Sequence, residues 1–124
     1  MPAATKSVAV LGASTNPAKF GNQAVRAFIA KGYTVYPVNP RESEIEQLPC
    51  FACIDDVPER PTVISVYLPP AVLIDTLPAI AARGCDELIL NPGTDTPEVL
   101  HQAELLGLNG IQACSLVALQ TGRL

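Results

Sequence analysis

The sequence predicts an α/β fold in which a parallel, doubly wound sheet is covered by helices on both faces. Short, uninterrupted apolar runs alternate along the chain with longer stretches whose apolar residues recur at helical spacing. Glycines follow several of the helical stretches, as expected where a helix ends. The 124 residues fit one domain of ordinary size. We therefore expect a single Rossmann-like domain over residues 1–124, with about five strands joined by right-handed crossovers.

Continuous apolar runs predict strands that are buried on both faces, as in a parallel sheet. The predicted strands cover Ser7–Gly12, Tyr33–Val38, Thr62–Leu68, Glu87–Asn91 and Gly110–Cys114. The irregular stretch Asn39–Arg60 contains three prolines. It is expected to hold one short strand near Cys50–Ala52 and one helical turn near Asp55–Val57.

The stretches between the strands have helical periodicity and recognisable ends. Pro97 suits the first turn of its helix, whereas Pro78 is expected to kink or break the helix that contains it. The predicted helices cover Gly21–Lys31, Ala71–Arg83, Thr96–Leu106 and, as a short closing helix, Leu116–Leu119.

Composition excludes several classes of protein. An apolar fraction of 48% with 16% charged residues excludes a disordered tail. The net charge of −4 disfavours a nucleic-acid partner and an anionic membrane surface. The longest nearly uncharged apolar stretch, Val63–Ile74, is too short to span a membrane. Residues 1–7 lack the apolar run of a signal peptide, so we expect a cytoplasmic protein.

The cysteines and the single histidine give little support for metal or redox chemistry. Cys50 and Cys53 have C-x-x-C spacing, but no second pair matches them, since Cys85 and Cys114 stand alone. No Ser-His-Asp or Cys-His arrangement is evident around His101. We expect partly buried, reduced thiols, no metal site and no catalytic residues.

Charge is distributed unevenly along the chain. Residues 1–41 hold five basic residues and no acidic ones, whereas residues 42–124 hold three basic and twelve acidic ones. A solvated helix face would account for part of this bias, and Glu42, Glu44 and Glu46 are interpreted as one solvated segment. An electropositive pocket for an anionic small ligand is the other interpretation, and the loop described next favours it.

The loop between the first strand and the first helix has the composition of a phosphate-binding turn. Gly12 allows the backbone to approach a phosphate closely, and the free amides at a helix start favour negative charge. Ser14, Thr15 and Asn16 add side-chain donors. A plain strand-to-helix turn is the alternative interpretation.

This loop does not carry the dinucleotide fingerprint, because Ser14 occupies the position of its second glycine. The second strand also lacks the terminal acidic residue that holds the ribose of NAD, and Arg41 lies close by instead. An arginine there suits a ribose that carries a phosphate. The candidates are therefore NADP and coenzyme A.

Several motifs resemble one family over about Val8–Cys114. They are Val10-Leu-Gly-Ala-Ser14, Phe20-Gly-Asn-Gln, Gly32-Tyr, Tyr36-Pro-Val-Asn-Pro40, Val66-Tyr-Leu-Pro-Pro70 and Asn91-Pro-Gly93. The chain resembles the stand-alone CoA-binding domain family, which is similar to the N-terminal domain of the succinyl-CoA synthetase alpha subunit.

The resemblance implies a coenzyme A site at the strand ends. The loop Ser14–Pro17 would meet the CoA phosphates, Val38 and Pro40 would border the adenine, and Arg41 would lie near the nucleotide phosphates. The residues Tyr67–Pro69 would flank the ligand, and the turn Asn91–Gly93 would face the pantetheine. The full set of implied binding residues is Gly12, Ala13, Ser14, Thr15, Asn16, Pro17, Lys19, Phe20, Val38, Asn39, Pro40, Arg41, Tyr67, Leu68, Pro69, Asn91, Pro92 and Gly93.

The sequence departs from the family near its end, where Gln112–Ser115 lacks the Asp-Arg-Cys run of many stand-alone members. We expect no second domain of the kind that carries the synthetase's phosphorylated histidine. The leading hypothesis is a non-catalytic protein that binds CoA or acyl-CoA, alone, as a homodimer or with a protein partner. The alternatives are an NADP-binding enzyme or enzyme subunit, and an interaction domain with a vestigial nucleotide site.

Overall fold

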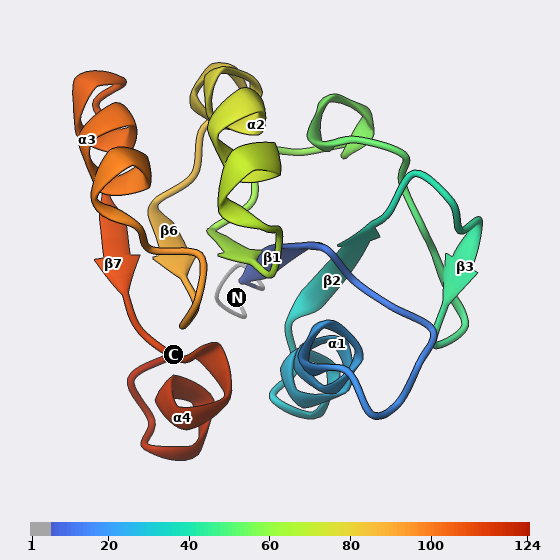
Figure 1. The fold of residues 1–124 in the computed structure, drawn as a ribbon. Helices are drawn as coiled ribbons and strands as arrows, with labels where there is room; N and C mark the ends of the chain where they lie inside the picture. The colour runs from blue at the N-terminus through green and yellow to red at the C-terminus, as the bar shows by residue number, and fades with distance from the viewer. Residues whose placement is uncertain (1–5) are drawn as a thin grey trace, which may run out of the picture.

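The computed structural model describes residues 6–124, and its centre is a five-stranded parallel sheet (Figure 1). The strands of this sheet are β1 (Ser7–Leu11), β2 (Thr34–Val38), β5 (Val63–Val66), β6 (Glu87–Leu90) and β7 (Gly110–Gln112). Their order is β2-β1-β5-β6-β7, and all neighbouring strands are parallel. The predicted Rossmann-like α/β sheet is confirmed.

Helices cover both faces of the sheet, and each face has its own apolar core (Figure 1). The helices of one face are α1 (Phe20–Ala30) and α4 (Ser115–Gln120), and those of the other are α2 (Pro70–Arg83) and α3 (Pro97–Leu105). Phe28 of α1 and Leu77 of α2 are fully buried. Burying a side chain of this size stabilises the fold by about 1.5–3 kcal/mol.

The two strands that follow β1 in the main sheet, β2 and β5, lie on opposite sides of it. The crossover through α1 leads to β2 on one side of β1, whereas the strand on the other side is β5. The carboxyl ends of β1 and β5 therefore form a topological switch point. Open α/β sheets bind their ligands beyond the strand ends at such a point, so the topology alone indicates where a site would lie.

A small hairpin between β2 and β5 is absent from the sequence prediction. It consists of β3 (Glu44–Ile45) and β4 (Leu48–Pro49), which pair antiparallel. The expected strand near Cys50–Ala52 is replaced by a single parallel bridge between Phe51 and Val38. The helical turn expected near Asp55–Val57 is present as the 3-10 helix η1 (Ile54–Asp56).

The helix α2 runs unbroken through Pro78, contrary to the expected kink or break. Pro78 faces solvent, while Leu73, Leu77 and Ile80 bury the opposite side of the helix completely. Proline has no amide hydrogen, so one carbonyl group of the helix lacks its usual donor, and water can replace that donor. The packing of the buried side therefore outweighs the cost of the missing hydrogen bond. None of the helices within residues 6–124 combines the length and apolar character needed to cross a membrane.

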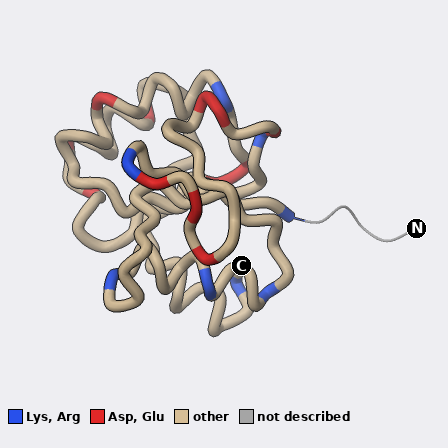
Figure 2. Tube along the Cα trace, turned by 90° about the vertical axis from the view of Figure 1, so that its right-hand side faces the viewer, with Lys and Arg blue, Asp and Glu red and all other residues tan. Residues whose placement is uncertain are grey.

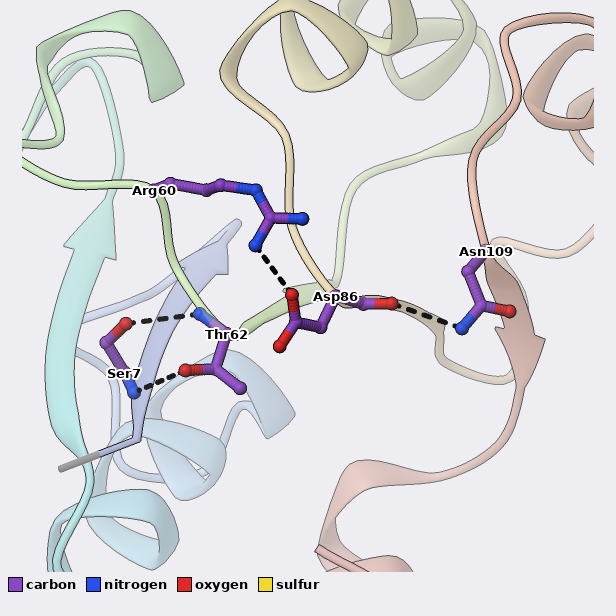
Figure 3. A network of polar contacts seen from close by, with 5 residues as sticks. All are labelled: Ser7, Arg60, Thr62, Asp86 and Asn109. Atoms are coloured by element: carbon purple, nitrogen blue, oxygen red, sulfur yellow. Dashed lines mark hydrogen bonds and ion pairs between the residues drawn. The ribbon is translucent and has the colours of Figure 1, made fainter. Parts of the chain in front are cut away.

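Polar contacts tie the strands together at the amino-terminal edge of the sheet (Figure 3). The backbone amide of Ser7 donates to the Thr62 hydroxyl, and the Thr62 amide donates to the Ser7 hydroxyl, both at 3.1 Å. Arg60 forms an ion pair with Asp86 at 2.6 Å, and the Asn109 amide donates to the Asp86 carbonyl at 3.1 Å. The polar side chains at the amino-terminal edge are therefore paired with one another. A ligand is expected at the carboxyl edge instead.

Candidate ligand-binding site

Two glycines allow the loop after β1 to approach its neighbours closely. Gly12 has a φ of +83°, and a Cβ atom there would lie 2.7 Å from the Tyr67 carbonyl oxygen. A Cβ atom on Gly21 would lie only 2.2 Å from the Gly12 carbonyl oxygen. Contacts this short are impossible for any other residue. The glycines thus bring the loop, the end of β5 and the start of α1 together.

Side chains within the loop stabilise its own turns. The Ser14 hydroxyl accepts a hydrogen bond from the Asn16 amide at 3.0 Å, and the Asn16 side-chain oxygen accepts one from the Ala18 amide at 3.0 Å. These polar residues therefore act as acceptors for the backbone of the loop. The sequence prediction assigned these side chains a different role, as hydrogen-bond donors to a ligand.

Several backbone amides at the loop have no acceptor within residues 6–124. They are the amides of Ala13, Ser14, Thr15, Phe20 and Gly21, the last two being at the start of α1. Unpaired amides at the start of a helix carry partial positive charge and form a common binding site for phosphate groups. The structure thus supplies the donors that an anionic ligand requires.

A cleft of about 630 Å³ extends from this loop along the carboxyl ends of β1, β5 and β6. It lies at the switch point of the sheet. The cleft is lined by Gly12, Ala13, Ser14, Ala18, Lys19, Phe20, Gly21, Asn39, Tyr67, Leu68, Pro69, Pro92, Gly93 and Thr94. A volume of this size is typical of a small-molecule site.

A profile of the family described as CoA binding domain matches residues 6–120. The chain belongs to this family.

Relatives of this CoA-binding domain are found both within long enzymes and as short proteins. It is 30% identical over 68% of its length to a trans-feruloyl-CoA synthase from an unknown prokaryotic organism. It is 32% identical over 64% of its length to acetate–CoA ligase (ADP-forming) II of Archaeoglobus fulgidus. The chain spans only 12% of the length of each of these enzymes. A solved conserved hypothetical protein from Pyrococcus furiosus is 33% identical, with a TM-score of 0.84, 90% of this chain covered and 97% of that protein.

Most of the predicted site residues of this CoA-binding domain line the cleft, and the others lie beside it. Thr15, Asn16 and Pro17 belong to the exposed part of the loop but are not in the cleft lining. Pro40 and Arg41 lie on the exposed turn after β2. The sequence prediction did not include Ala18, Gly21 and Thr94, which also line the cleft.

Val38 and Asn91 are buried in the structure, and neither is in the lining of the cleft. Val38 is 6% exposed and pairs with Phe51. Asn91 is 1% exposed, and its amide donates to Ser65 at 3.0 Å and to the Val66 carbonyl at 2.8 Å. Its side-chain oxygen accepts from the Ser115 amide at 2.8 Å. Asn91 thereby fixes the turn that contributes Pro92, Gly93 and Thr94 to the cleft.

Tyr67 borders the cleft, and its hydroxyl group is buried without a hydrogen-bond partner among residues 6–124. Its backbone amide donates to the Leu11 carbonyl at 2.8 Å, which fixes the residue to the end of β1. Burial raises the pKa of the Tyr67 phenol. Tyr67 therefore remains neutral and adds no negative charge beside the free amides.

The basic residues of the first third of the chain do not all face the cleft. Figure 2 shows several Lys and Arg residues at the lower end of the molecule, where Figure 1 places α1 and α4, and most Asp and Glu residues above them. Among the five, only Lys19 lines the cleft, and Arg26 is held by Asn22 through a 2.8 Å hydrogen bond. Within the lining of the cleft, Lys19 is therefore the basic side chain that lies beside the loop amides.

The remaining candidate groups for chemistry are scattered. No cluster of three or more potential metal ligands is found within residues 6–124. His101 is exposed on α3, and the four cysteines are free thiols. Burial raises the pKa of Cys85 to about 11, which makes its thiol unreactive at neutral pH.

Proposed function

We propose that this chain binds coenzyme A or an acyl-CoA and does not itself catalyse a reaction. The observation that carries the proposal is the set of unpaired amides at the Gly12–Gly21 loop, most of which belong to residues that line a cleft, in a chain of the CoA-binding domain family. The diphosphate of CoA is the group that such amides bind best. Residues 1–124 would act as one CoA-binding unit.

The remaining parts of CoA would follow the cleft from this loop. The pantetheine would run between Tyr67–Pro69 and the turn Asn91–Gly93, where the lining is mainly apolar and backbone. The adenine would lie near Val38 and Pro40, and Arg41 is free to reach a phosphate on the ribose. This arrangement uses each of the strand ends that border the switch point.

A protein partner is part of the proposal. The curated relatives named above are a CoA ligase and a CoA synthase, of which this chain corresponds to only a small part. Within residues 6–124, His101 is on exposed α3 and Cys85 is buried, so neither is paired as a nucleophile with a base. A chain that holds CoA for chemistry on another polypeptide would account for both observations.

Calorimetric titration with CoA, NADP and NAD tests the ligand. We expect CoA to bind and both dinucleotides to bind at least tenfold more weakly. The variant Ser14→Asp places a carboxylate beside the free amides and should abolish CoA binding. The variant Asn109→Asp adds the same charge at the opposite edge of the sheet and serves as the control. NADP binding in place of CoA, or equal affinity of both variants for CoA, would refute the proposal.

A further inference from the structure

Asn22, on the first turn of α1, is completely buried and uses every polar atom of its side chain. Its Nδ2 donates to the Ser14 carbonyl oxygen at 2.9 Å and to the Glu46 carboxylate at 3.1 Å. Its Oδ1 accepts from the Nε of Arg26 at 2.8 Å. A buried amide with such a complete set of partners holds one orientation. Asn22 is not in the lining of the cleft, so it contacts the loop from the side that faces away from the cleft.

The contact with Ser14 determines where a free amide points. The Ser14 carbonyl and the Thr15 amide belong to the same peptide unit, and in a trans peptide these two groups point in opposite directions. When Asn22 holds the carbonyl, the Thr15 N–H is directed away from Asn22. Arg26 supports the same loop from α1, since its Nη2 donates to the Pro17 carbonyl at 3.3 Å.

Glu46 reaches Asn22 from the hairpin formed by β3 and β4. The hairpin turns through Glu46 and Gln47, whose φ values of 51° and 65° are in the left-handed region. Residues other than glycine, asparagine and aspartate rarely occupy both central positions of such a turn. The neighbouring Ile45 is 1% exposed and anchors the hairpin in the core below α1. The strained turn therefore presents the Glu46 carboxylate to Asn22.

We propose that Asn22 and Glu46 are positioning residues for the anion-binding loop, and that the hairpin acts through them as a clamp on that loop. This inference rests on the proposed function for its ligand, but the clamp is a property of the free protein as well. Glu46 fixes the Asn22 amide, Asn22 fixes the Ser14 carbonyl, and the Thr15 amide is left in the orientation that a phosphate needs. Glu46 also places a negative charge near the anion site. Its hydrogen bond is therefore expected to raise the affinity for an anion, whereas its charge is expected to lower it.

Substitutions at exposed Glu46 separate these two effects and leave the buried Asn22 intact. Glu46→Ala removes the acceptor, and we expect it to weaken CoA binding roughly three- to tenfold. Glu46→Gln keeps an acceptor oxygen but no charge, so its CoA affinity should equal or exceed that of the unmodified protein. Glu44→Ala is the matched control, because it removes a carboxylate from the same hairpin that makes no side-chain hydrogen bond with other residues of the range 6–124.

Hydrogen exchange on the ligand-free protein tests the clamp without any ligand. We expect faster exchange of the hydrogen-bonded loop amides of Asn16 and Ala18 in Glu46→Ala, normal exchange in Glu46→Gln and Glu44→Ala, and unchanged exchange in β1 and β5. Equal exchange rates in Glu46→Ala and Glu44→Ala would overturn the clamp. An equal increase of CoA affinity in Glu46→Ala and Glu46→Gln would also overturn it. If the unmodified protein binds no CoA, the proposed function fails while the exchange result still decides the inference.

Discussion

The Asn39 side chain donates a hydrogen bond of 2.8 Å to the carbonyl oxygen of Ala13, which joins the end of β2 to the loop after β1. The Asn39 side-chain oxygen in turn accepts from the Arg41 amide at 2.8 Å. Because the Ala13 carbonyl and the Ser14 amide share one peptide unit, this contact also fixes the direction of the Ser14 N–H. Two asparagines, Asn39 and Asn22, thus each orient one of the unpaired amides.

Substitution of Asn39 by alanine should therefore weaken ligand binding as well as the fold. Asn39→Ala removes two hydrogen bonds, each of which contributes about 0.5–1.5 kcal/mol of folding free energy. We expect a smaller loss of stability for Asn109→Ala, which removes one comparable bond at the opposite edge of the sheet. Only Asn39→Ala should reduce CoA affinity, by roughly three- to tenfold in calorimetry. Equal affinities of the two variants would contradict the role of Asn39 in the loop.

The sequence predicts the sheet and the cleft because both follow from strong local patterns. Apolar runs define buried strands, and Gly12 marks a turn that only glycine can make. The hairpin escaped prediction since its turn, Glu46–Gln47, contains none of the residues that normally adopt a positive φ. Asn22 likewise resembles any polar residue of a helix, because its partners Ser14 and Glu46 are distant in sequence. Tertiary hydrogen bonds of this kind leave no local signal.

Gly21 provides a test of the close packing between α1 and the loop. Replacing a helical glycine by alanine ordinarily stabilises a helix by about 1 kcal/mol. At Gly21 the added Cβ would meet the Gly12 carbonyl oxygen at 2.2 Å, so we expect Gly21→Ala to destabilise the protein by at least about 2 kcal/mol. Gly110→Ala is the control, since its Cβ would meet only Leu90 at 3.5 Å. Urea denaturation that gives the two variants equal stability would contradict the packing described here.

The strained turn of the hairpin predicts a stabilising substitution. Gln47 has a φ of 65°, and an L-residue in this region costs about 1–2 kcal/mol relative to glycine. After allowance for the greater flexibility of glycine in the unfolded chain, Gln47→Gly should stabilise the protein by about 0.5–1 kcal/mol. Gln102→Gly, within α3, should destabilise it by about 1 kcal/mol. Thermal unfolding of both variants checks these opposite signs, and a lower melting temperature for Gln47→Gly would be the contrary result.

Tyrosine ionisation should limit stability at alkaline pH. Burial, followed by the hydrogen bond to Glu59, raises the pKa of Tyr36 from 10.0 to about 12. The folded protein therefore binds the phenolic proton more tightly than the unfolded chain does. This contribution to stability is complete below pH 10 and is lost as the pH rises from 10 towards 12. Urea denaturation across this range should show a shallower decline for Tyr36→Phe, and identical pH profiles would contradict the assignment.

Arg41 is expected to distinguish CoA from its dephosphorylated form. It lies on the exposed turn after β2, and its guanidinium makes no hydrogen bond or ion pair with other residues of the range 6–124. A free guanidinium beside the site can bind the 3′-phosphate of CoA through two hydrogen bonds. Such a contact contributes about 1.5–3 kcal/mol, or roughly 10- to 150-fold in affinity. Calorimetry on Arg41→Ala should show this loss for CoA and almost none for dephospho-CoA, whereas Lys31→Ala should affect neither ligand. Equal losses for both ligands in Arg41→Ala would assign the residue to the diphosphate or to general electrostatic attraction instead.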